Sequence, residues 1–346
     1  MIDQASRLRA LVGDKKEYSP AAAESAPQLT MVSPQAAPPP LPLAPEYRAM
    51  HLQGAVDTPS SLSPFADSEP TPDDAIFRPA FAGARIIAVT SGKGGVGKTN
   101  LTVNLAVALR EEGKRVIIID ADMGMANVDV VLGTSSKKTL LSLLEPGVTF
   151  NDILTHGPHG VDYISGGSGM EHIAEFTPEE RKILWEKLAV CDGQADIILI
   201  DTGAGLGRNV LDFILAADEV ILVTTPEPTA ITDAYAVMKA YSHYEKDRKL
   251  RLVVNRVYDE SDSSDVVAKL RQTAQRFLGS DLEYGGCIYE DRNVLKSVRR
   301  QTPFMVADSD TIASRCVKAI AATLLTGSRP EVKRGWREFL ARFWNN

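Results

Sequence analysis

The residues with the clearest chemical potential form a glycine-rich loop at 91–99, Ser-Gly-Lys-Gly-Gly-Val-Gly-Lys-Thr. An apolar run at 86–91 precedes the loop, and a helical pattern at 100–112 follows it. This is a GxxxxGK[ST] loop in the strand-loop-helix context of phosphate binding, because its glycines let backbone N–H groups and the helix N-terminus converge on phosphate oxygens. We therefore predict a nucleotide site. The predicted contacts are Gly92, Gly94, Gly95, Val96, Gly97, Lys98, Thr99 and Asn100.

Three side chains of this loop have different expected roles. Lys98 should reach the β- and γ-phosphates, and the Thr99 hydroxyl should bind Mg²⁺. Lys93 is an addition, because a phosphate-binding loop needs no second lysine there and Lys98 already holds the phosphates. Lys93 is thus free to serve a neighbouring molecule. The alternative, a strand-to-helix turn without a ligand, does not explain why every position of the motif is filled.

Carboxylates follow two further apolar runs. The run at 116–119 leads into Asp120 and Asp122, and the run at 196–200 leads into Asp201. Because the carboxyl ends of parallel strands meet at one edge of a sheet, these side chains should lie beside the glycine-rich loop, where Mg²⁺ and an attacking water must sit. Asp201 should bind Mg²⁺ through water. Of the first pair, one carboxylate would face the metal and one the water; the alternative is a solvated, Asp-rich turn.

The elements that must position these groups alternate between strands and helices. Runs apolar enough to be buried on both faces, as in a parallel sheet, lie at 86–91, 116–120, 196–201, 219–225 and 250–255. Helical patterns lie at 100–112, 178–190, 207–217, 229–245 and 264–278. We predict an α/β fold with a doubly wound, mostly parallel sheet over 85–326.

The heptapeptide at 93–99, KGGVGKT, matches residue for residue the loop of the MinD/ParA family of deviant P-loop ATPases, which this chain resembles. The resemblance implies an ATP-hydrolysing protein that dimerises around ATP, with Lys93 contacting the ATP of the partner subunit. It also implies that Asp122 orients the hydrolytic water, that Asp120 belongs to the metal shell, and that 123–129 form a first switch loop. The expected catalytic residues are Lys93, Lys98 and Asp122, and the expected metal ligands are Thr99, Asp120 and Asp201.

Adenine recognition depends on two shorter matches. The Asn-Arg pair at 255–256 resembles the family's adenine-binding pair, and QTPF at 301–304 resembles the second wall of its base pocket. A strand that ends at an Asn turn is the alternative for the first match. Glu227 and Asp233 fall where the family has its dimer interface and switch-coupled helix, although a helix N-terminus explains Asp233 nearly as well. The expected base contacts are Asn255, Arg256 and Pro303.

Two regions of different composition precede this domain. Residues 1–16 have apolar side chains at helical spacing and could form a small docking helix. Residues 17–84 hold thirteen of the chain's twenty prolines. Because each proline removes a backbone donor and blocks helix interiors, we predict a disordered linker at 17–84. The alternative to a plain tether is a proline-rich ligand for an SH3-like partner.

The N-terminal segment indicates a resemblance to one group within this family. Residues 3–9, Asp-Gln-Ala-Ser-Arg-Leu-Arg, match the DQAxxLR pattern of the FlhG (FleN, YlxH) family of flagellar-number ATPases, which the chain also resembles at 119–130, 200–207 and 224–236. The resemblance implies that this segment binds the GTPase FlhF and stimulates its hydrolysis. Flagellar switch (C-ring) proteins or a flagellar transcription regulator are further expected partners. The long proline-rich insertion departs from the family pattern. The expected partner contacts are Asp3, Gln4, Ala5, Leu8 and Arg9.

The C-terminal stretch at 327–346 has an amphipathic helical pattern with basic residues beside an apolar stripe. Tryptophans at the edges of the stripe suit a lipid headgroup boundary, and the positive charges would attract anionic lipid. We therefore predict a membrane-targeting helix that binds the inner face of the cell membrane reversibly, as the resemblance to MinD-type ATPases also implies. The alternative is a terminal helix packed on the domain's own core. The stripe is Trp336, Phe339, Leu340, Phe343 and Trp344.

The composition of the chain disfavours several classes of function. A net charge of −7 gives no bulk attraction to nucleic acid, which disfavours a DNA-binding partition ATPase. The three cysteines lack paired spacing, which argues against an iron–sulfur scaffold. No apolar run reaches about 18 residues, so we expect a cytoplasmic protein. The alternatives left open are a MinD-like division-site ATPase, a ParA-like partition ATPase and a non-hydrolysing adaptor.

Overall fold

The computed structural model describes residues 83–122, 127–167, 176–244, 250–279, 282–326 and 335–345. The predicted activator segment at 1–16 lies outside these residues. So do most of the predicted linker at 17–84 and the part of the predicted switch loop at 123–126.

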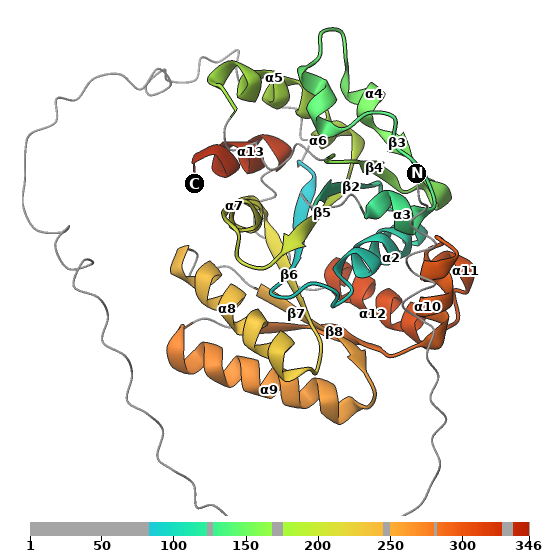
Figure 1. Cartoon of the computed structure of the whole chain (residues 1–346), viewed down its shortest axis with the longest axis vertical. Coiled ribbons are helices and arrows are strands. Elements are labelled where there is room, and N and C mark those ends of the chain that lie inside the picture. Colours follow the sequence, from blue (N-terminus) through green and yellow to red (C-terminus); the bar gives the residue numbers. More distant parts are fainter. Residues whose placement is uncertain are drawn as a thin grey trace, which may run out of the picture. The chain divides into compact units, whose positions relative to one another are not determined.

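A mostly parallel sheet forms the centre of the described part of the chain (Figure 1). Its strands are β1 (Arg85–Ser91), β2 (Val116–Ala121), β3 (Thr155–His156), β4 (Asp162–Ile164), β5 (Ile197–Ala204), β6 (Glu219–Thr224), β7 (Leu250–Val257) and β8 (Leu282–Tyr289). They lie side by side in the order β3-β4-β2-β5-β1-β6-β7-β8, and all pairs are parallel except β3 with β4. Every residue of β1, β2 and β6 is buried, as helices on both faces require.

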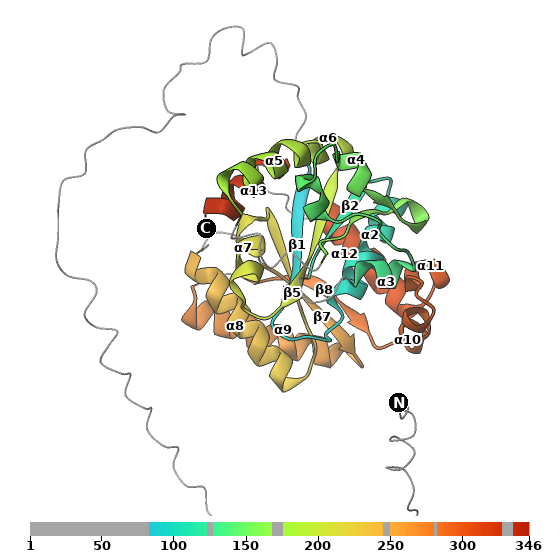
Figure 2. The same cartoon turned by 45° about the horizontal axis from the view of Figure 1, so that its top comes forward.

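Helices cover both faces of the sheet and enclose two apolar cores (Figures 1 and 2). Those contributing to one core are α2 (Lys98–Glu111), α3 (Val128–Leu132), α10 (Arg292–Arg299), α11 (Phe304–Ala307) and α12 (Ile312–Thr326). Those contributing to the other are η2 (Leu140–Leu144), α4 (Phe150–Ile153), α5 (Pro178–Leu188), α6 (Cys191–Gln194), α7 (Arg208–Ala216), α8 (Pro228–Tyr244), α9 (Glu260–Phe277) and α13 (Gly335–Asn345). A short turn of 3₁₀ helix, η3 (Pro158–Gly160), precedes β4.

The predicted α/β class with a doubly wound, mostly parallel sheet is therefore confirmed. Each predicted strand and internal helix occurs, with ends displaced by a few residues. Strand β8 was not expected from the sequence, because Gly285 and Gly286 interrupt its apolar run and are typical of a turn.

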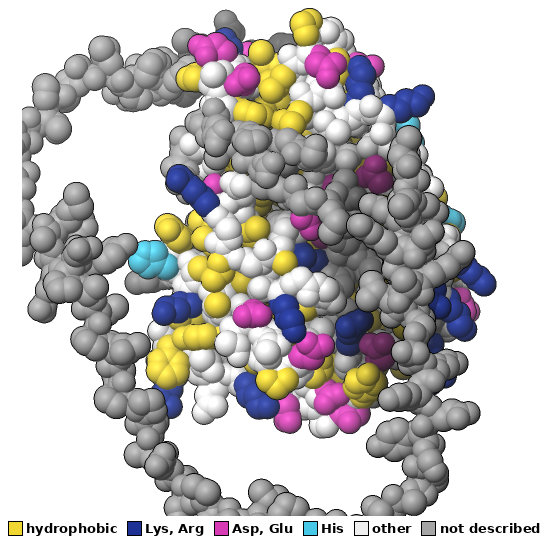
Figure 3. Space-filling model, in the orientation of Figure 1, with side chains coloured by type: hydrophobic (Ala, Val, Ile, Leu, Met, Phe, Trp, Pro, Cys, Tyr) yellow, Lys and Arg dark blue, Asp and Glu magenta, His cyan; other side chains and the backbone are white. Residues whose placement is uncertain are grey.

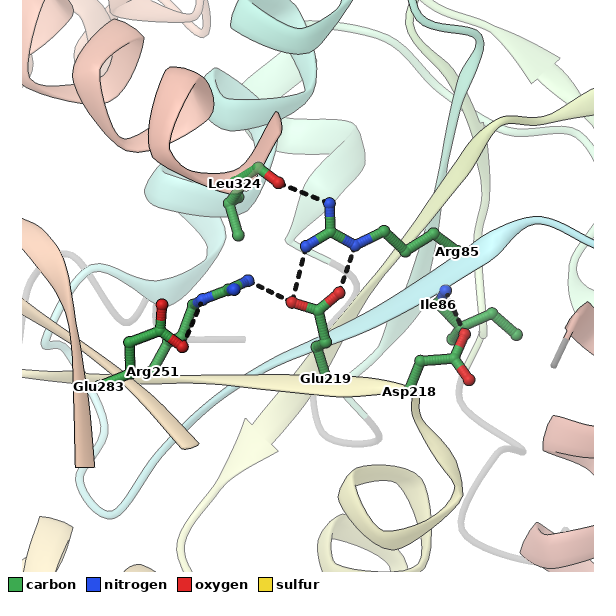
Figure 4. Close-up of polar contacts among 7 residues, drawn as sticks. All are labelled: Arg85, Ile86, Asp218, Glu219, Arg251, Glu283 and Leu324. Carbon is green, nitrogen blue, oxygen red and sulfur yellow. Dashed lines mark hydrogen bonds and ion pairs between the residues drawn. The ribbon is translucent and has the colours of Figure 1, made fainter. Parts of the chain in front are cut away.

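At the amino edge of the sheet, buried charges from separate strands neutralise one another (Figure 4). Both carboxylate oxygens of Glu219 accept bonds from Arg85, and Arg251 donates to the same carboxylate. The Arg85 guanidinium also donates to the carbonyl of Leu324 at 2.6 Å, and Arg251 pairs with Glu283 at 3.3 Å. Because buried charges are tolerated only when paired, this cluster joins β1, β6 and β7 to the end of α12.

The apolar stripe of the C-terminal helix lies in the core in this structure, so binding of the stripe to a membrane stays a prediction. α13 packs on α7, with the ring centroids of Phe343 and Phe213 4.6 Å apart. The alternative is what the structure shows, because a groove of apolar side chains removes the stripe from water as a bilayer would. No helix among the described residues combines the length and apolar character needed to cross a bilayer. Exposed fractions are Trp336 2%, Phe339 2%, Leu340 4% and Phe343 7%, and Trp344 is half-buried.

A single carboxylate oxygen holds the start of α13. Asp192 Oδ1, on α6, accepts the N–H of Trp336 at 2.6 Å and that of Ala84 at 3.3 Å. The first N–H groups of a helix have no intrahelical acceptor, so Asp192 caps α13 from another element. The same oxygen thereby fastens the first and the last described segments of the chain.

Candidate nucleotide-binding site

The glycine-rich loop lies between the end of β1 and the start of α2, close against two other elements. Gly95 and Gly97 have φ angles of 78° and 97°, which other residues rarely adopt. A Cβ on Gly97 would lie 2.4 Å from Nδ2 of Asn255, and one on Gly92 would lie 2.2 Å from the carbonyl oxygen of Asp233. Glycine at these positions therefore lets the loop contact β7 and α8.

Two of the three predicted metal ligands, Thr99 and Asp201, are in direct contact. Thr99 Oγ1 donates to Asp201 Oδ2 at 2.7 Å, and Thr102 Oγ1 donates to Asp201 Oδ1 at 3.0 Å. Burial raises the pKa of Asp201 to about 6, against the opposing effects of the Thr99 hydrogen bond and the Lys98 charge. A cation beside this carboxylate would favour its charged form.

These oxygen donors fit Mg²⁺, which is usually bound by one or two carboxylates together with substrate phosphates and waters. The described residues contain no group of three or more His, Cys, Asp or Glu side chains that could hold a metal ion alone. The phosphates of a bound nucleotide would supply further oxygen ligands.

Asp120 lies beside Asp201 in the β2–β5 pairing and is bonded to backbone groups. Its Oδ1 accepts the N–H of Asp122 at 3.1 Å, and its Oδ2 accepts those of Asn127 at 3.0 Å and Val128 at 3.1 Å. Burial and then the charge of Asp201 raise the pKa of Asp120 to about 7. Asp120 thus caps the start of α3, a role that the sequence did not predict. Its assignment to the metal shell stays a prediction.

Asp122, the predicted water-orienting residue, is half-buried just beyond the end of β2. Its Oδ1 lies 3.7 Å from the position that a Cβ on Gly203 would occupy in β5. β5 is the neighbour of β1, which leads into the glycine-rich loop. The structure therefore brings Asp122 to the same sheet edge as Asp201 and Lys98.

Lys93, the additional lysine, is bonded to the start of α8. Its Nζ donates to Glu227 Oε2 at 2.9 Å and to Thr229 Oγ1 at 2.8 Å. The bond from Lys93 lowers the pKa of Glu227. Both side chains are well exposed, 38% for Lys93 and 55% for Glu227, and exposed pairs contribute little to stability. Little free energy is therefore needed to turn Lys93 toward another partner.

A pocket of about 200 Å³ opens beside the loop where a base would lie. Asn255 and Arg256 line it, and Asn255 Nδ2 also donates to the carbonyl of Val96 at 2.7 Å. Pro303, predicted as a base contact, is buried as the N-cap of α11, and the side chain after it, Phe304, lines the pocket instead. The whole lining is Gly95, Gly97, Asn100, Leu101, Asn255, Arg256, Ile288, Tyr289, Glu290, Asp291, Val294, Leu295, Val298 and Phe304.

The wall that β8 and α10 contribute to this pocket was not expected from the sequence. Its residues are ordinary apolar and charged types far along the chain from the loop. The place of this wall in the fold could have indicated its role, since the turn after β8 must reach the carboxyl edge of the sheet, where ligands bind in such folds.

A second hollow, of about 910 Å³, lies between α7, α8 and α9 and is open to solvent. Hydrophobic side chains are exposed over this region on the face shown in Figure 3. Leu206, Tyr244 and Phe277 are among its exposed lining residues. It lacks the glycine-rich loop and the paired carboxylates, so the nucleotide candidate is the first pocket with its adjoining loop.

The family described as ParA, "NUBPL iron-transfer P-loop NTPase", matches residues 83–325. Together with the loop, the two strand-end carboxylates and the sheet order, this shows that the chain belongs to the ParA/MinD family of P-loop NTPases. The three cysteines, Cys191, Cys287 and Cys316, form no disulfide bond.

Named relatives show which members of this family the chain is similar to. The chain is 39% identical to the antiactivator FleN of Pseudomonas aeruginosa, covering 74% of this chain and 91% of FleN. It is 35% identical to the flagellum site-determining protein YlxH of Helicobacter pylori, covering 75% of this chain and 89% of YlxH. MinD of Pyrococcus horikoshii, solved in complex with Mg-ADP, is 28% identical with a TM-score of 0.56, covering 70% of this chain and 98% of that one.

Proposed function

We propose that this chain is an ATP-hydrolysing dimerisation switch that regulates the number and placement of flagella. The contact of Thr99 with the buried Asp201 at the end of the glycine-rich loop carries the nucleotide part of the proposal. The similarity to FleN and YlxH supports the flagellar part. A MinD-like role in division-site placement is the alternative, supported by more distant relatives such as MinD of Bacillus subtilis, 29% identical.

The residues at the carboxyl edge divide the work of hydrolysis. Lys98 and the loop N–H groups would neutralise and orient the phosphates, while Thr99 would bind Mg²⁺ and Asp201 would bind it through water. When bound there, Mg²⁺ would neutralise the negative charge that builds up on the phosphate oxygens. Asp122 orients the water that attacks the γ-phosphate, and the bond from phosphorus to the β,γ-bridging oxygen breaks. Asn255 and Phe304 line the pocket for adenine.

Dimerisation is proposed to depend on Lys93, which would exchange Glu227 for the ATP of the partner subunit. With hydrolysis blocked by Asp122→Ala, ATP should convert the protein to a dimer in light scattering. Adding Lys93→Ala should return it to monomer while ATP binding by calorimetry is retained. Lys98→Ala is the contrasting change, since it should weaken ATP binding itself by about 10- to 100-fold through loss of a charged hydrogen bond. A dimer that persists without Lys93 would contradict the cross-subunit role.

The N-terminal segment is proposed to bind and stimulate the GTPase FlhF through Asp3, Gln4, Ala5, Leu8 and Arg9. A peptide of residues 1–20 should accelerate GTP hydrolysis by FlhF, and the same peptide with Gln4→Ala should not. An inert peptide would argue against this assignment. Recovery of division proteins in place of FlhF and flagellar switch proteins, on co-purification from cells, would favour the MinD-like alternative.

Membrane association is proposed for a state in which α13 has left α7, because the docked stripe is covered. The Asp122→Ala protein should then sediment with anionic liposomes in ATP more than in ADP. Adding Phe343→Glu should abolish sedimentation in both nucleotides. Equal sedimentation of the two proteins would leave α13 as a packing element only.

A further inference from the structure

The segment that lines one side of the base pocket contacts, near each of its ends, a residue that does not itself line the pocket. This segment, 301–305, is called the strap below; it contains Phe304, which lines the pocket, and it leads into α11. Gln301 has a left-handed φ of 50°, which non-glycine residues rarely adopt. Such a conformation persists only where surrounding contacts hold it.

Asn104 of α2 fixes the downstream end of the strap. It is 0% exposed, its Oδ1 accepts the N–H of Met305 at 2.9 Å, and its Nδ2 donates to the carbonyl of Asn100 at 2.7 Å. Asparagine is not favoured in a helix interior, and a buried amide is costly unless both of its polar atoms are bonded. Since Met305 lies in the first turn of α11, its N–H has no intrahelical acceptor, and Asn104 supplies one.

Gly133 at the end of α3 faces the other end of the strap. Its φ is 66°, and a Cβ there would lie 2.4 Å from the carbonyl oxygen of Gln301. Only a residue without a side chain allows this approach. The other end of α3 is capped by Asp120. The strap therefore contacts both α2, which follows the glycine-rich loop, and α3, which Asp120 caps.

We propose that Asn104 is a positioning residue for the nucleotide base, and that Gly133 supports the same strap from its other end. Asn104 contacts the strap and not the pocket, and it acts by fixing where Phe304 lies. The proposal rests on the proposed binding of ATP at this site. It predicts that loss of Asn104 weakens contacts to the base while the phosphate loop keeps its own contacts.

The test compares ATP with inorganic tripolyphosphate, which can occupy the phosphate loop but has no base, in calorimetric titrations of the full chain with Mg²⁺. Asn104→Leu keeps the branched shape but leaves the Met305 N–H without an acceptor. Because the strap would no longer hold Phe304 in place, ATP affinity should fall about tenfold, the size of one lost hydrogen-bond-strength contact, while tripolyphosphate affinity stays unchanged. Asn104→Asp keeps the acceptor and should retain most of the preference for ATP.

A control variant separates positioning from general damage to α2. Val107 lies on the same helix, is 2% exposed and belongs to the core, so Val107→Ala should lower the melting temperature without changing the ratio of the two affinities. Gly133→Ala, which displaces the strap from its other end, should lower the ratio as Asn104→Leu does, and it serves as the test if Asn104→Leu does not fold.

The outcomes separate this proposal from the proposed function. A ratio that is unchanged in both Asn104→Leu and Gly133→Ala overturns the positioning role. So does an equal fall of ATP and tripolyphosphate affinity in Asn104→Leu, because that reports damage to the loop. Wild-type protein that binds neither compound would instead refute the proposed ATP site itself.

Discussion

The two edges of the central sheet differ in how their buried charges are arranged. At the amino edge, the carboxylate of Glu219 is bonded by both Arg85 and Arg251, and every charge of this trio has an opposite charge beside it. At the carboxyl edge, Asp120 and Asp201 are both buried, and the charge of Asp201 raises the pKa of Asp120. The first arrangement satisfies its charges by folding alone. In the second, Lys98 and the neighbouring hydrogen bonds offset the burial of Asp201 only in part, so a bound cation would stabilise the charged carboxylates further.

Breaking the amino-edge cluster should have the largest effect on stability. Glu219→Gln would leave the buried Arg85 without a counter-charge and beside a second buried guanidinium, which typically destabilises a protein by about 3–5 kcal/mol. Urea denaturation of the nucleotide-free protein measures this. Glu283→Gln is the matched control, because the Glu283 side chain is 27% exposed and lies at the margin of the cluster. Equal losses of stability from the two changes would show that burial of the Glu219 ion pairs does not determine how much they stabilise the protein.

A smaller effect of opposite sign is expected at the carboxyl edge. The pKa of Asp201 in the folded protein, about 6, lies above its ordinary value of 3.8. As pH rises from about 4 to 6, the unfolded chain therefore loses this proton first, and the folded state becomes less stable. Asp201→Asn removes this loss and should make the metal-free protein more stable than wild type by about 1–3 kcal/mol at pH 8, with little gain at pH 4.

Denaturation in EDTA across this pH range tests the second prediction. The amide that Asp201→Asn introduces can still bond the two threonine hydroxyls, so the variant changes charge more than shape. If the free energy of unfolding changes with pH in the same way in both proteins, then the folded state does not disfavour the charged form of Asp201. Nucleotide binding with Mg²⁺ should weaken in the same variant, because the metal loses a carboxylate.

The sequence could place together the parts of the candidate site that lie in short motifs. The glycine-rich loop directly follows the buried strand β1 and Asp201 lies near the carboxyl end of β5, so local pattern alone brings them to one edge of the sheet. The second wall of the pocket is assembled from residues near Tyr289 and Val294, whose types occur on any surface and acquire a role only through strand order. The role of Asn104 is hidden for the same reason, because its partner is a backbone group 201 positions away.

The packing of the C-terminal helix on α7 could not be predicted for a different physical reason. An amphipathic stripe reports that one side of a helix avoids water, but it does not identify what covers that side. The groove that receives Phe343 is built partly by Phe213 on α7, and nothing in the spacing of the stripe records that groove. The Glu219 trio is similarly invisible in sequence, since its charges come from strands far apart along the chain.

The carboxylate of Asp192 also makes the two ends of the domain mechanically dependent on each other. One oxygen accepts the N–H of Ala84, just before β1, and the N–H of Trp336, where α13 begins. A displacement of Ala84 would therefore disturb the same oxygen that caps α13. Within the described residues, one side chain thus couples the start of β1 to the start of the last helix.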